Sequence, residues 1–326
     1  MRVWHRWVQV WNGQELPWPM ALVRLLLGAA MLFDFLTFLP LGMVEVVMLP
    51  ADQGGVLPSE WKVPPPWWDW FGATPASAWG LYIGLLASSF LVMIGCFTRT
   101  AVVVLMLLSA QFAWMHGAGD RGIDTMMRNV LMILAFSGAG RGLSVDAWWR
   151  TGSLWGDGAF VPSWPRRLLL LQLVAMYFAA GVSKYAQQWW PWGGYTALWF
   201  IWNDWPVSAV AGQAWVDTTA ALRFSQFATF ITILWELTFP AMLWMWWAWR
   251  RGRPAWVRRL RPDLVYVALG AIFHLGIAVW LQLGIFPWAM LALYPAFLSG
   301  REWARIADAI RSKNLRGVVE AVRIGP

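Results

Sequence analysis

The chain has 326 residues, of which 59 % are hydrophobic and only 13 % are charged. This balance lies far from that of soluble globular domains and excludes an ordinary pair of them, although the length alone would allow two. Several apolar runs approach or exceed the roughly 20 residues that cross the core of a bilayer. The net charge of +8 does not indicate nucleic-acid binding, because the cations lie at the ends of those runs. We therefore predict an all-α, polytopic transmembrane helical bundle.

The cysteine and histidine content limits the chemistry that the chain can support. Cys96 is the single cysteine, which excludes an intramolecular disulfide and a cysteine-based metal site. The three histidines are far apart in the predicted topology, and no carboxylate pair has the spacing of metal ligands. No phosphate-binding glycine loop opens a helix. We therefore expect no metal ion and no nucleic-acid partner.

Three segments are predicted along the chain. Residues 1–19 are basic and aromatic without an apolar core, so we predict an interfacial segment in place of a cleavable signal peptide. A transmembrane domain is predicted over residues 20–299, followed by a basic, amphipathic tail over residues 300–326. About eight spans are expected, near residues 20–39, 79–97, 100–116, 124–138, 168–184, 224–249, 264–283 and 285–298. The Trp-rich residues 189–222 favour re-entrant or interfacial pieces over a full crossing.

The distribution of lysine and arginine predicts the orientation of these spans. Most of the 25 basic residues fall in segments that eight crossings place inside when the N-terminus is cytoplasmic. Because cytoplasmic loops carry the excess of basic residues, we predict cytoplasmic termini in a bacterial inner membrane. Lys184, at the end of the fifth span, then faces the extracytoplasmic side.

Several ionisable groups fall inside the predicted spans, where each needs a partner or a wet cavity. One interpretation is structural, with salt bridges such as Asp34 or Asp124 with Arg128 holding helices in register, and with His274 bonded to a neighbouring carbonyl. The other is a polar cavity that opens towards the outside and gathers these groups. The candidates are Arg24, Asp34, Asp124, Arg128, Lys184, Glu236 and His274.

The sharpest functional signal lies in residues 168–194, LLLLQLVAMYFAAGVSKYAQQWWPWGG. Lys184 stands where the apolar helix ends. It is either a lysine whose long stem lets the ammonium reach the headgroups, or a partly desolvated lysine at the mouth of a membrane cavity. In the second case it could act as a base. The residues alone leave both interpretations open.

Four sequence blocks occur in an order that resembles a known family. They are RLLLGAAMLFDF, ILAFSGAGRGLSVDAWW, MYFAAGVSKYAQQWW and FHLGIAVWLQLGIFPWAMLALYPAF. They resemble the first span, the fourth span with its following turn, the lysine-bearing helix end and the last membrane block of the vitamin K-dependent γ-glutamyl carboxylase family. Bacterial members of this wider group are often called HTTM-domain proteins. The resemblance covers roughly residues 20–300.

The resemblance implies a carboxylase or epoxidase-like lyase that uses vitamin K hydroquinone or another quinol, with O₂ and CO₂. In that family a lysine deprotonates the hydroquinone, the product with O₂ removes a γ-proton from a peptide glutamate, and CO₂ adds to the carbanion. Lys184 matches that lysine, and His274 matches a family histidine near the site, so both are expected to be catalytic. The residues expected to bind the cofactor are Arg128, Asp34, Asp124, Tyr177 and Trp189.

The sequence also departs from the family pattern. The family's doubled lysine is Ser183–Lys184 here, and a histidine expected at the start of the fourth span is replaced in the neighbourhood of Met127, Arg128 and Asn129. The large extramembrane region that follows the membrane part of the animal enzyme has no counterpart before Pro326. These departures favour quinol chemistry or binding over carboxylation of a protein glutamate.

Two other classes of function stay open. One is a non-catalytic membrane protein that binds lipid or quinone, or that binds a co-encoded membrane partner. The other is a transporter, which the lack of an evident internal repeat disfavours. The expected partners are accordingly membrane lipids, a lipid-soluble quinol, and a peptide substrate or a co-encoded membrane protein.

Overall fold

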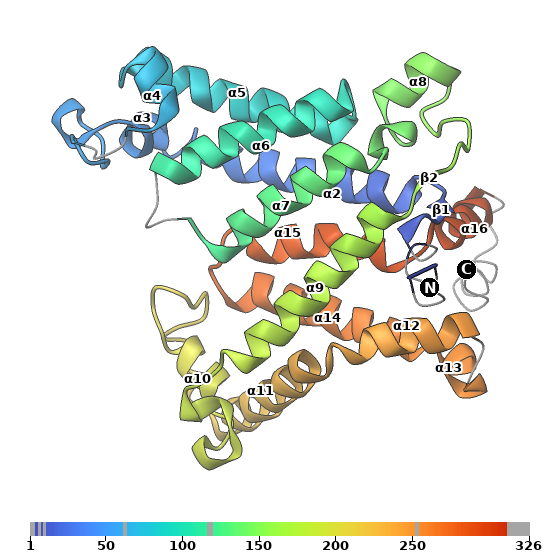
Figure 1. Cartoon of the computed structure of the whole chain (residues 1–326). Coiled ribbons are helices and arrows are strands. Elements are labelled where there is room, and N and C mark those ends of the chain that lie inside the picture. Colours follow the sequence, from blue (N-terminus) through green and yellow to red (C-terminus); the bar gives the residue numbers. More distant parts are fainter. Residues whose placement is uncertain are drawn as a thin grey trace. The chain divides into compact units, whose positions relative to one another are not determined.

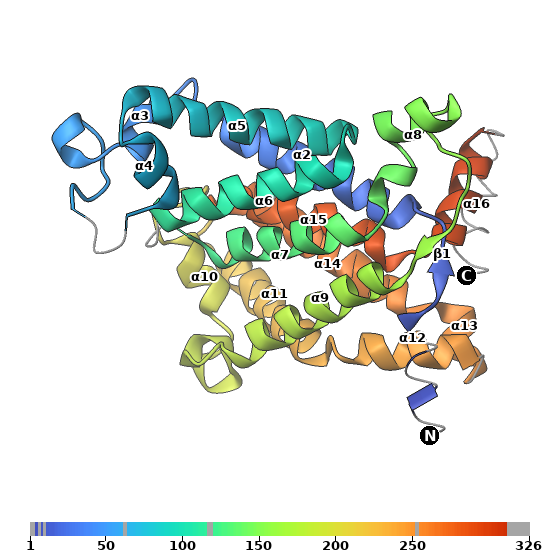
Figure 2. The same ribbon diagram turned by 45° about the horizontal axis from the view of Figure 1, so that its top comes forward.

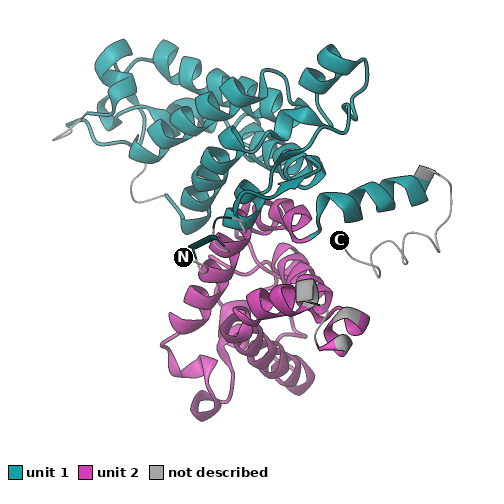
Figure 3. Cartoon of the chain, turned by 45° about the vertical axis from the view of Figure 1, so that its right-hand side comes forward, with its two compact units in different colours: residues 1–168, 298–326 teal, residues 169–297 magenta. Residues whose placement is uncertain are grey.

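Helices make up nearly all the regular structure of the computed structural model, which describes residues 4–5, 8, 11–60, 64–115, 120–251 and 254–311 (Figure 1). The predicted all-α fold is therefore confirmed. The chain divides into two compact units, coloured separately in Figure 3. Unit 1 comprises residues 1–168 and 298–326, and unit 2 comprises residues 169–297.

Unit 1 is built on four successive helices in which each packs against the next: α2 with α5, α5 with α6, and α6 with α7 (Figure 2). Short pieces and the C-terminal helix surround these four. The helices of unit 1 are α2 (Trp18–Leu36), α3 (Met43–Met48), η1 (Ala51–Gln53), α4 (Pro66–Phe71), α5 (Pro75–Ile94), α6 (Thr98–Met115), α7 (Gly122–Phe136), η2 (Ala139–Arg141), α8 (Val145–Thr151) and α16 (Gly300–Arg311). The first turn of α9 (Trp164–Val182) also belongs to unit 1.

A small antiparallel sheet ties the start of the described chain to the segment before α9. It pairs β1 (Gln14–Glu15) with β2 (Val161–Pro162). Residues 1–19 were predicted to form an interfacial segment, and a strand at Gln14–Glu15 was not expected there. Residues 1–3, 6–7 and 9–10 of that predicted segment lie outside the described ranges.

Arg24 is fully buried in unit 1 and explains why the first span tolerates an arginine. Its guanidinium donates to the carbonyls of Val92 at 2.5 Å and Met93 at 2.8 Å, and to that of Leu143 at 2.5 Å. Val92 and Met93 lie in the last turn of α5, where backbone carbonyls lack helical partners and carry partial negative charge. Arg24 therefore closes the end of α5 and joins it to α2.

The turn after α5 depends on Gly95, which has a left-handed φ of 69°. A Cβ atom there would lie 2.7 Å from Cζ of Arg24, so glycine is needed for both conformation and space. Asp146 then accepts hydrogen bonds from the N–H groups of Phe97 and Thr98, each at 2.8 Å, at the start of α6. The serine-valine-aspartate block that resembles the carboxylase family thus has a helix-capping role here.

Unit 2 contains the rest of α9 and the helices that follow it. They are η3 (Gln187–Trp189), η4 (Pro191–Gly193), α10 (Ala197–Trp202), α11 (Thr219–Thr238), α12 (Ala241–Arg251), α13 (Ala255–Leu260), α14 (Pro262–Trp280), α15 (Phe286–Leu293) and η5 (Tyr294–Phe297). Its aromatic core centres on the buried Trp202, whose ring contacts Trp215, Phe224 and Trp280. Residues 189–218 form only short helices and turns, as their polar and proline content indicated, and residues 219–222 begin α11.

Every stretch predicted to cross the membrane contains a helix, but the helices differ in length. Five of those described are long and apolar enough to span a bilayer, or six if α11 and α12, which meet at an angle of 59°, form one broken span. α7 has 15 residues, and the apolar helix over Phe286–Phe297 is also shorter than a span. Pro240 stands at the bend, where a proline cannot continue the helical hydrogen bonds.

The predicted tail begins as a helix, α16. Its continuation over residues 312–326 lies outside the described residues.

The predicted span boundaries are off by a few residues, because polar or proline-containing first turns carry little hydropathy. α5, for example, begins at Pro75 with Thr74 as its N-cap, four residues before its apolar run was expected to start.

Candidate functional site

Lys184 lies just beyond the end of α9 and is paired with a carboxylate in unit 2. Its Nζ is 2.5 Å from Oε2 of Glu236 and donates to the carbonyl of Ala180 at 3.2 Å. Nζ also lies 4.9 Å from the centre of the Trp189 ring, within the range of a cation–π contact. The side chains of Lys184 and Glu236 are only 16 % and 4 % exposed. This burial favours the desolvated lysine over one that reaches freely to the headgroups.

Gly181 allows the two helices that carry this ion pair to approach each other. A Cβ atom at Gly181 would lie 3.0 Å from Cβ of Glu236 and 3.2 Å from the backbone nitrogen of Leu237. Small residues at such positions let backbones in membranes pack closely. The glycine one turn before Lys184 therefore sets the distance over which lysine and glutamate can meet.

The segment after Lys184 folds back onto it. The indole N–H of Trp190 donates to the backbone carbonyl of Lys184 at 2.8 Å, and the Trp190 ring stacks on Trp192 with centroids 5.6 Å apart. Trp192 is exposed. Indoles with one buried and one wet edge are typical of a membrane interface. The contacts of Trp190 and Trp192 enclose this side of the ion pair with aromatic rings.

A second polar cluster is buried in the same unit. The Tyr177 hydroxyl is 2.8 Å from Nε2 of His274 and 3.0 Å from the Tyr294 hydroxyl. The rings of Trp235 and Phe239 pack on Tyr177 with centroids 4.6 and 4.5 Å away. The sequence analysis left two interpretations of His274: a core histidine that bonds to a carbonyl, or a residue of a functional site. In the structure His274 bonds to the phenol of Tyr177.

His274 is fully buried, and its second ring nitrogen, Nδ1, has no partner among the residues that the structure describes. A neutral imidazole has one donor and one acceptor nitrogen. Whichever tautomer bonds Tyr177, one polar atom of His274 is left for another group. Because an unsatisfied buried polar group costs about 1–3 kcal/mol, this nitrogen is a good position for a ligand or a water molecule.

The two clusters use one face of α9. Tyr177 and Gly181 are four residues apart, the spacing that aligns side chains along a helix, and Lys184 follows just beyond the end of α9. On α11, the neighbouring residues Trp235 and Glu236 contact Tyr177 and Lys184 respectively. Acid, base, phenol and imidazole therefore gather where α9 meets α11, inside a largely aromatic surrounding.

The predicted pairing of Asp34 or Asp124 with Arg128 is wrong. Arg128 forms two hydrogen bonds with Asp120, at 3.0 and 2.6 Å. Asp124 pairs with Arg121 at 2.9 and 3.1 Å, and Asp34 lies 3.8 Å from the same arginine. The hydrogen bond to Asp124 raises the pKa of Arg121, so this guanidinium stays protonated. Asp120 and Arg121 were not considered, because they lie in the polar turn before α7 and not in an apolar run.

The predicted site residues therefore fall into two groups, one in each compact unit. Unit 2 brings together Lys184, Trp189, Tyr177 and His274, whereas Asp34, Asp124 and Arg128 belong to an ion-pair group in unit 1. Sequence reasoning did not assign Glu236 and Tyr294 to the site. Glu236 had a signal, as a carboxylate inside an apolar helix, but no residue pattern identified its partner.

The described residues contain no group of three or more histidine, cysteine, aspartate or glutamate side chains that could hold a metal ion. The lysine, glutamate, histidine and tyrosine side chains at the Lys184 site can transfer protons and form hydrogen bonds.

Comparison with known proteins gives one family. A family model described as the HTTM domain matches residues 15–303. Neither the curated proteins nor the solved structures gave a match. The match covers most of the chain, including both compact units and the Lys184 site. Together with the apolar helices, it shows that this chain is a membrane protein of the HTTM domain family.

Proposed function

We propose that this protein is a membrane enzyme that oxidises a quinol-type cofactor in the lipid phase, with Lys184 as the proton-accepting group. The observation that carries the proposal is the buried pair of Lys184 and Glu236 beside a buried phenol–imidazole cluster. Ionisable groups are retained in apolar helices at a high free-energy cost, and they mark functional sites by default. The resemblance of MYFAAGVSKYAQQWW to the lysine-bearing block of the carboxylase family supports the same residue.

The residues present fit a quinol by their chemistry. An aromatic ring with two oxygens needs apolar walls and a few hydrogen-bonding groups at its edge. Trp235, Phe239 and Phe286 supply rings around Tyr177 and His274. Nδ1 of His274 supplies a buried polar atom that lacks a partner among the described side chains. A bound quinol would supply reducing equivalents for O₂ and an acidic hydroxyl.

Glu236 determines how Lys184 could act as a base. An ammonium next to a carboxylate cannot accept a proton, so its own proton must first move to Oε2 of Glu236. That transfer leaves an amine beside a carboxylic acid, and a surrounding of low dielectric constant favours such a neutral pair over isolated charges. The amine nitrogen then accepts a proton from an acidic hydroxyl, while Glu236 keeps the first one. The pair acts as one proton-accepting unit.

Coupling of this reaction to carboxylation is a further part of the proposal. The family resemblance supports it at Lys184 and His274, whereas the replacement near Met127, Arg128 and Asn129 weakens it. We also propose that the site faces the extracytoplasmic side of a bacterial inner membrane, because the excess of basic residues falls on the segments that would then be inside.

The test follows the absorbance of an added reduced quinone under O₂, with the purified protein in nanodiscs. We expect oxidation above the rate of the empty nanodisc, its loss in Lys184→Ala, and a decrease of roughly 100-fold or more in Glu236→Gln, the usual size of an acid–base contribution. Arg223→Ala, at an exposed position of α11, is the matched control. Unchanged oxidation in a well-folded Lys184→Ala protein would overturn the proposal.

A second candidate is a non-catalytic quinone or lipid binder, or a partner-binding protein. The closed pair of Lys184 and Glu236 favours it, because each charge already has a partner and the pair holds α9 against α11. A binder would take up quinone with saturation but without oxidation, and Lys184→Met with Glu236→Leu would bind as well as the unmodified chain. A transporter would instead show saturable uptake into proteoliposomes.

A further inference from the structure

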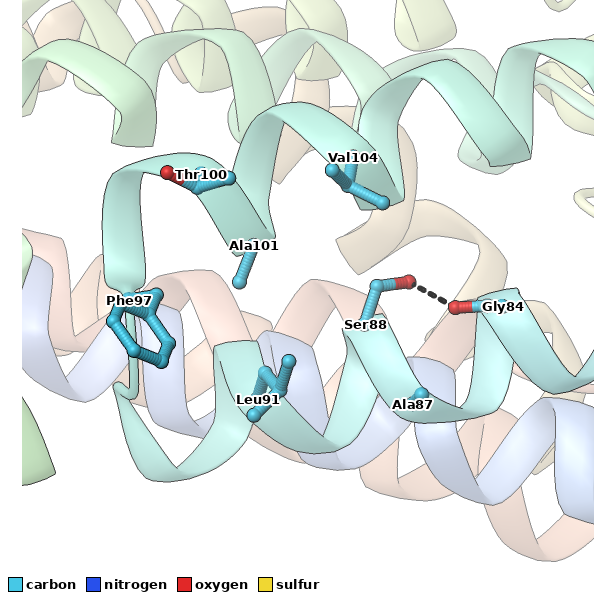
Figure 4. Close-up of a pocket in the computed structure, with 8 residues that line it drawn as sticks. All are labelled: Gly84, Ala87, Ser88, Leu91, Phe97, Thr100, Ala101 and Val104. Atoms are coloured by element: carbon cyan, nitrogen blue, oxygen red, sulfur yellow. Dashed lines mark hydrogen bonds between the residues drawn. The ribbon is translucent and has the colours of Figure 1, made fainter.

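Unit 1 has an open groove between α5 and α6, and none of the residues that line it is charged (Figure 4). Unit 2 is different, because a row of three hydrogen-bonding side chains lies inside it. Tyr294, Tyr177 and His274 form this row. The Tyr177 hydroxyl stands in the middle, 3.0 Å from the hydroxyl of Tyr294 and 2.8 Å from Nε2 of the histidine.

The row comes from three helical segments of unit 2, and a glycine makes room for one end of it. Tyr177 is on α9, His274 is on α14, and Tyr294 begins η5. Gly270 and His274, one turn apart, are the two buried residues of α14. A Cβ atom at Gly270 would lie 2.2 Å from the hydroxyl oxygen of Tyr294. Any larger residue there would push this hydroxyl out of the row.

Each end of the row can bond one more group. Nδ1 of the fully buried His274 has no partner among the described residues. At the other end, Tyr177 is the only polar partner that the described part of the chain gives the Tyr294 hydroxyl. A neutral imidazole and two phenols bring three protons to the row. Two of them form the two hydrogen bonds, so one proton is always left at one end.

The remaining proton can stand at either end of the row. If both hydroxyls donate towards the histidine, Nε2 accepts and the remaining proton is on Nδ1, which becomes a donor. If Nε2 donates to Tyr177, the Tyr177 hydroxyl donates to Tyr294, and Nδ1 becomes an acceptor. Each arrangement keeps both hydrogen bonds and leaves one donor without a partner in the row. The hydrogen bonds themselves therefore favour neither direction strongly.

Resting on the function proposed above, we propose that this row lets one site hold both a quinol and the quinone formed from it. The hydroxyl of a quinol needs an acceptor, and the carbonyl of a quinone needs a donor. Nδ1 of His274 supplies either one, because the protons of the row can shift. A site with a fixed donor would disfavour one of the two forms, since a buried polar group would lose its partner.

The same shift carries one proton of the reaction. When Nδ1 accepts the hydroxyl proton of the quinol, the Nε2 proton moves to the oxygen of Tyr177, whose own proton moves to the oxygen of Tyr294. The partly exposed Tyr294 then gives its first proton to water, and the row holds three protons as before. Oxidation to the quinone removes two protons and two electrons. Lys184 takes the other proton and O₂ takes the two electrons, as in the proposed function.

Solid-state ¹⁵N NMR of the full chain in nanodiscs measures which ring nitrogen of His274 carries the proton. The protein is labelled at its three histidines, and the signals of interest are those lost in His274→Gln. We expect the proton on Nδ1 after addition of menadione, a 1,4-quinone, and on Nε2 after addition of its hydroquinone, menadiol, under nitrogen. In Tyr294→Phe, Tyr177 keeps Nε2 as its only acceptor in the row. We therefore expect the Nδ1 proton with either compound and with none.

Calorimetric titration with the same two compounds measures the consequence for binding. The unmodified protein should bind both with similar dissociation constants. Tyr294→Phe keeps the ring and should weaken the binding of menadiol relative to menadione roughly tenfold, the effect of one unpaired buried donor. Tyr266→Phe is the matched control, because this partly exposed phenol of unit 2 donates to Thr238 at 2.9 Å, outside the row. It should change neither the ratio nor the spectrum.

The outcomes separate the row from the quinol oxidation proposed above. Loss of oxidation in Lys184→Ala, with an unchanged ratio and spectrum in Tyr294→Phe, would keep the enzyme and overturn the role of the row. The expected ratio and spectrum without any oxidation by the unmodified protein would keep the row and overturn the enzyme. A His274 signal that neither compound alters would assign Nδ1 to water and would also overturn the role of the row.

Discussion

The two compact units place charges among apolar helices in different ways. In unit 1, Arg24 donates to backbone carbonyls and Asp146 accepts from backbone N–H groups, so each side chain completes the end of a helix. In unit 2, Lys184 and Glu236 rely mainly on each other, and His274 keeps a nitrogen without a partner among the described residues. A charge bonded to backbone at a helix end has little freedom to exchange protons. The side-chain ion pairs described for unit 1 use arginine, which keeps its proton, whereas a lysine can pass one to its glutamate, which is why we place chemistry in unit 2.

The largest effect is expected from Arg24→Met in unit 1. The substitution leaves the carbonyls of Val92, Met93 and Leu143 without their donor. We expect the free energy of unfolding to fall by more than about 3 kcal/mol, because each unsatisfied buried group costs about 1–3 kcal/mol. Thermal unfolding in detergent measures the loss, with Arg223→Met as an exposed control. A midpoint like that of the control would mean that Arg24 is not a structural residue.

Breaking the ion pair of unit 2 should have a somewhat smaller effect that can be reversed. Glu236→Leu leaves the Lys184 ammonium buried without its partner and should destabilise the protein by about 3 kcal/mol. Adding Lys184→Met removes the second charge and should restore most of that stability, which a double-mutant cycle measures. The restored protein should still fail to oxidise quinol. Retained oxidation would show that the pair only holds the helices together.

Gly181→Ala tests the close approach of α9 and α11. The new methyl group would stand 3.0 Å from Cβ of Glu236, and overpacking of this kind costs about 1–3 kcal/mol. Gly122→Ala is the matched control in unit 1, because no atom lies within 4 Å of the added Cβ. We expect a lower unfolding midpoint and slower quinol oxidation for the first variant only. Equal midpoints would mean that the helices can separate without loss.

The smallest effect is expected from Arg128→Gln. Arg128 and Asp120 are 17 % and 23 % exposed, and Asp120 stands in the polar turn before α7, so the carboxylate of this pair is more open to water than Glu236 at 4 %. Exposed ion pairs contribute up to about 1 kcal/mol, and we expect a loss within that range by thermal unfolding. Quinol oxidation should not change, because Arg128 belongs to the ion-pair group of unit 1. A strong loss of activity would restore Arg128 to the site in which the sequence first placed it.

The sequence predicts the helices well and their partners poorly. Apolar runs are long, so the positions of α2, α5 and α14 follow from hydropathy within a few residues. Lys184 and Glu236, by contrast, are 52 residues apart, and Tyr177 and His274 are 97 apart. No local pattern indicates which helix faces lie against each other. The family resemblance pointed to Lys184 but gave no sign that Glu236 forms an ion pair with it.

The prediction of Asp34 or Asp124 as the partner of Arg128 is wrong for a related reason. Hydropathy marks charges that lie inside apolar helices and gives no weight to charges in the polar turns between them. Asp120 stands in the turn before α7, only eight residues from Arg128. A carboxylate that close in sequence can meet an arginine with little loss of chain entropy, so it is a better first candidate than one on another span.

The bonds of Arg24 also bear on the order in which the protein can be assembled. Arg24 is made early, whereas its acceptors at Val92 and Leu143 follow 68 and 119 residues later. Chains emerge from the ribosome N-terminus first. The first span therefore meets the bilayer carrying a guanidinium that has no protein partner yet, and its position near the start of α2 lets the long side chain reach back to the membrane surface. Only when α5 has been inserted and the segment at Leu143 has been made can Arg24 form its bonds, so α2 is fixed in place only after segments that are synthesised later.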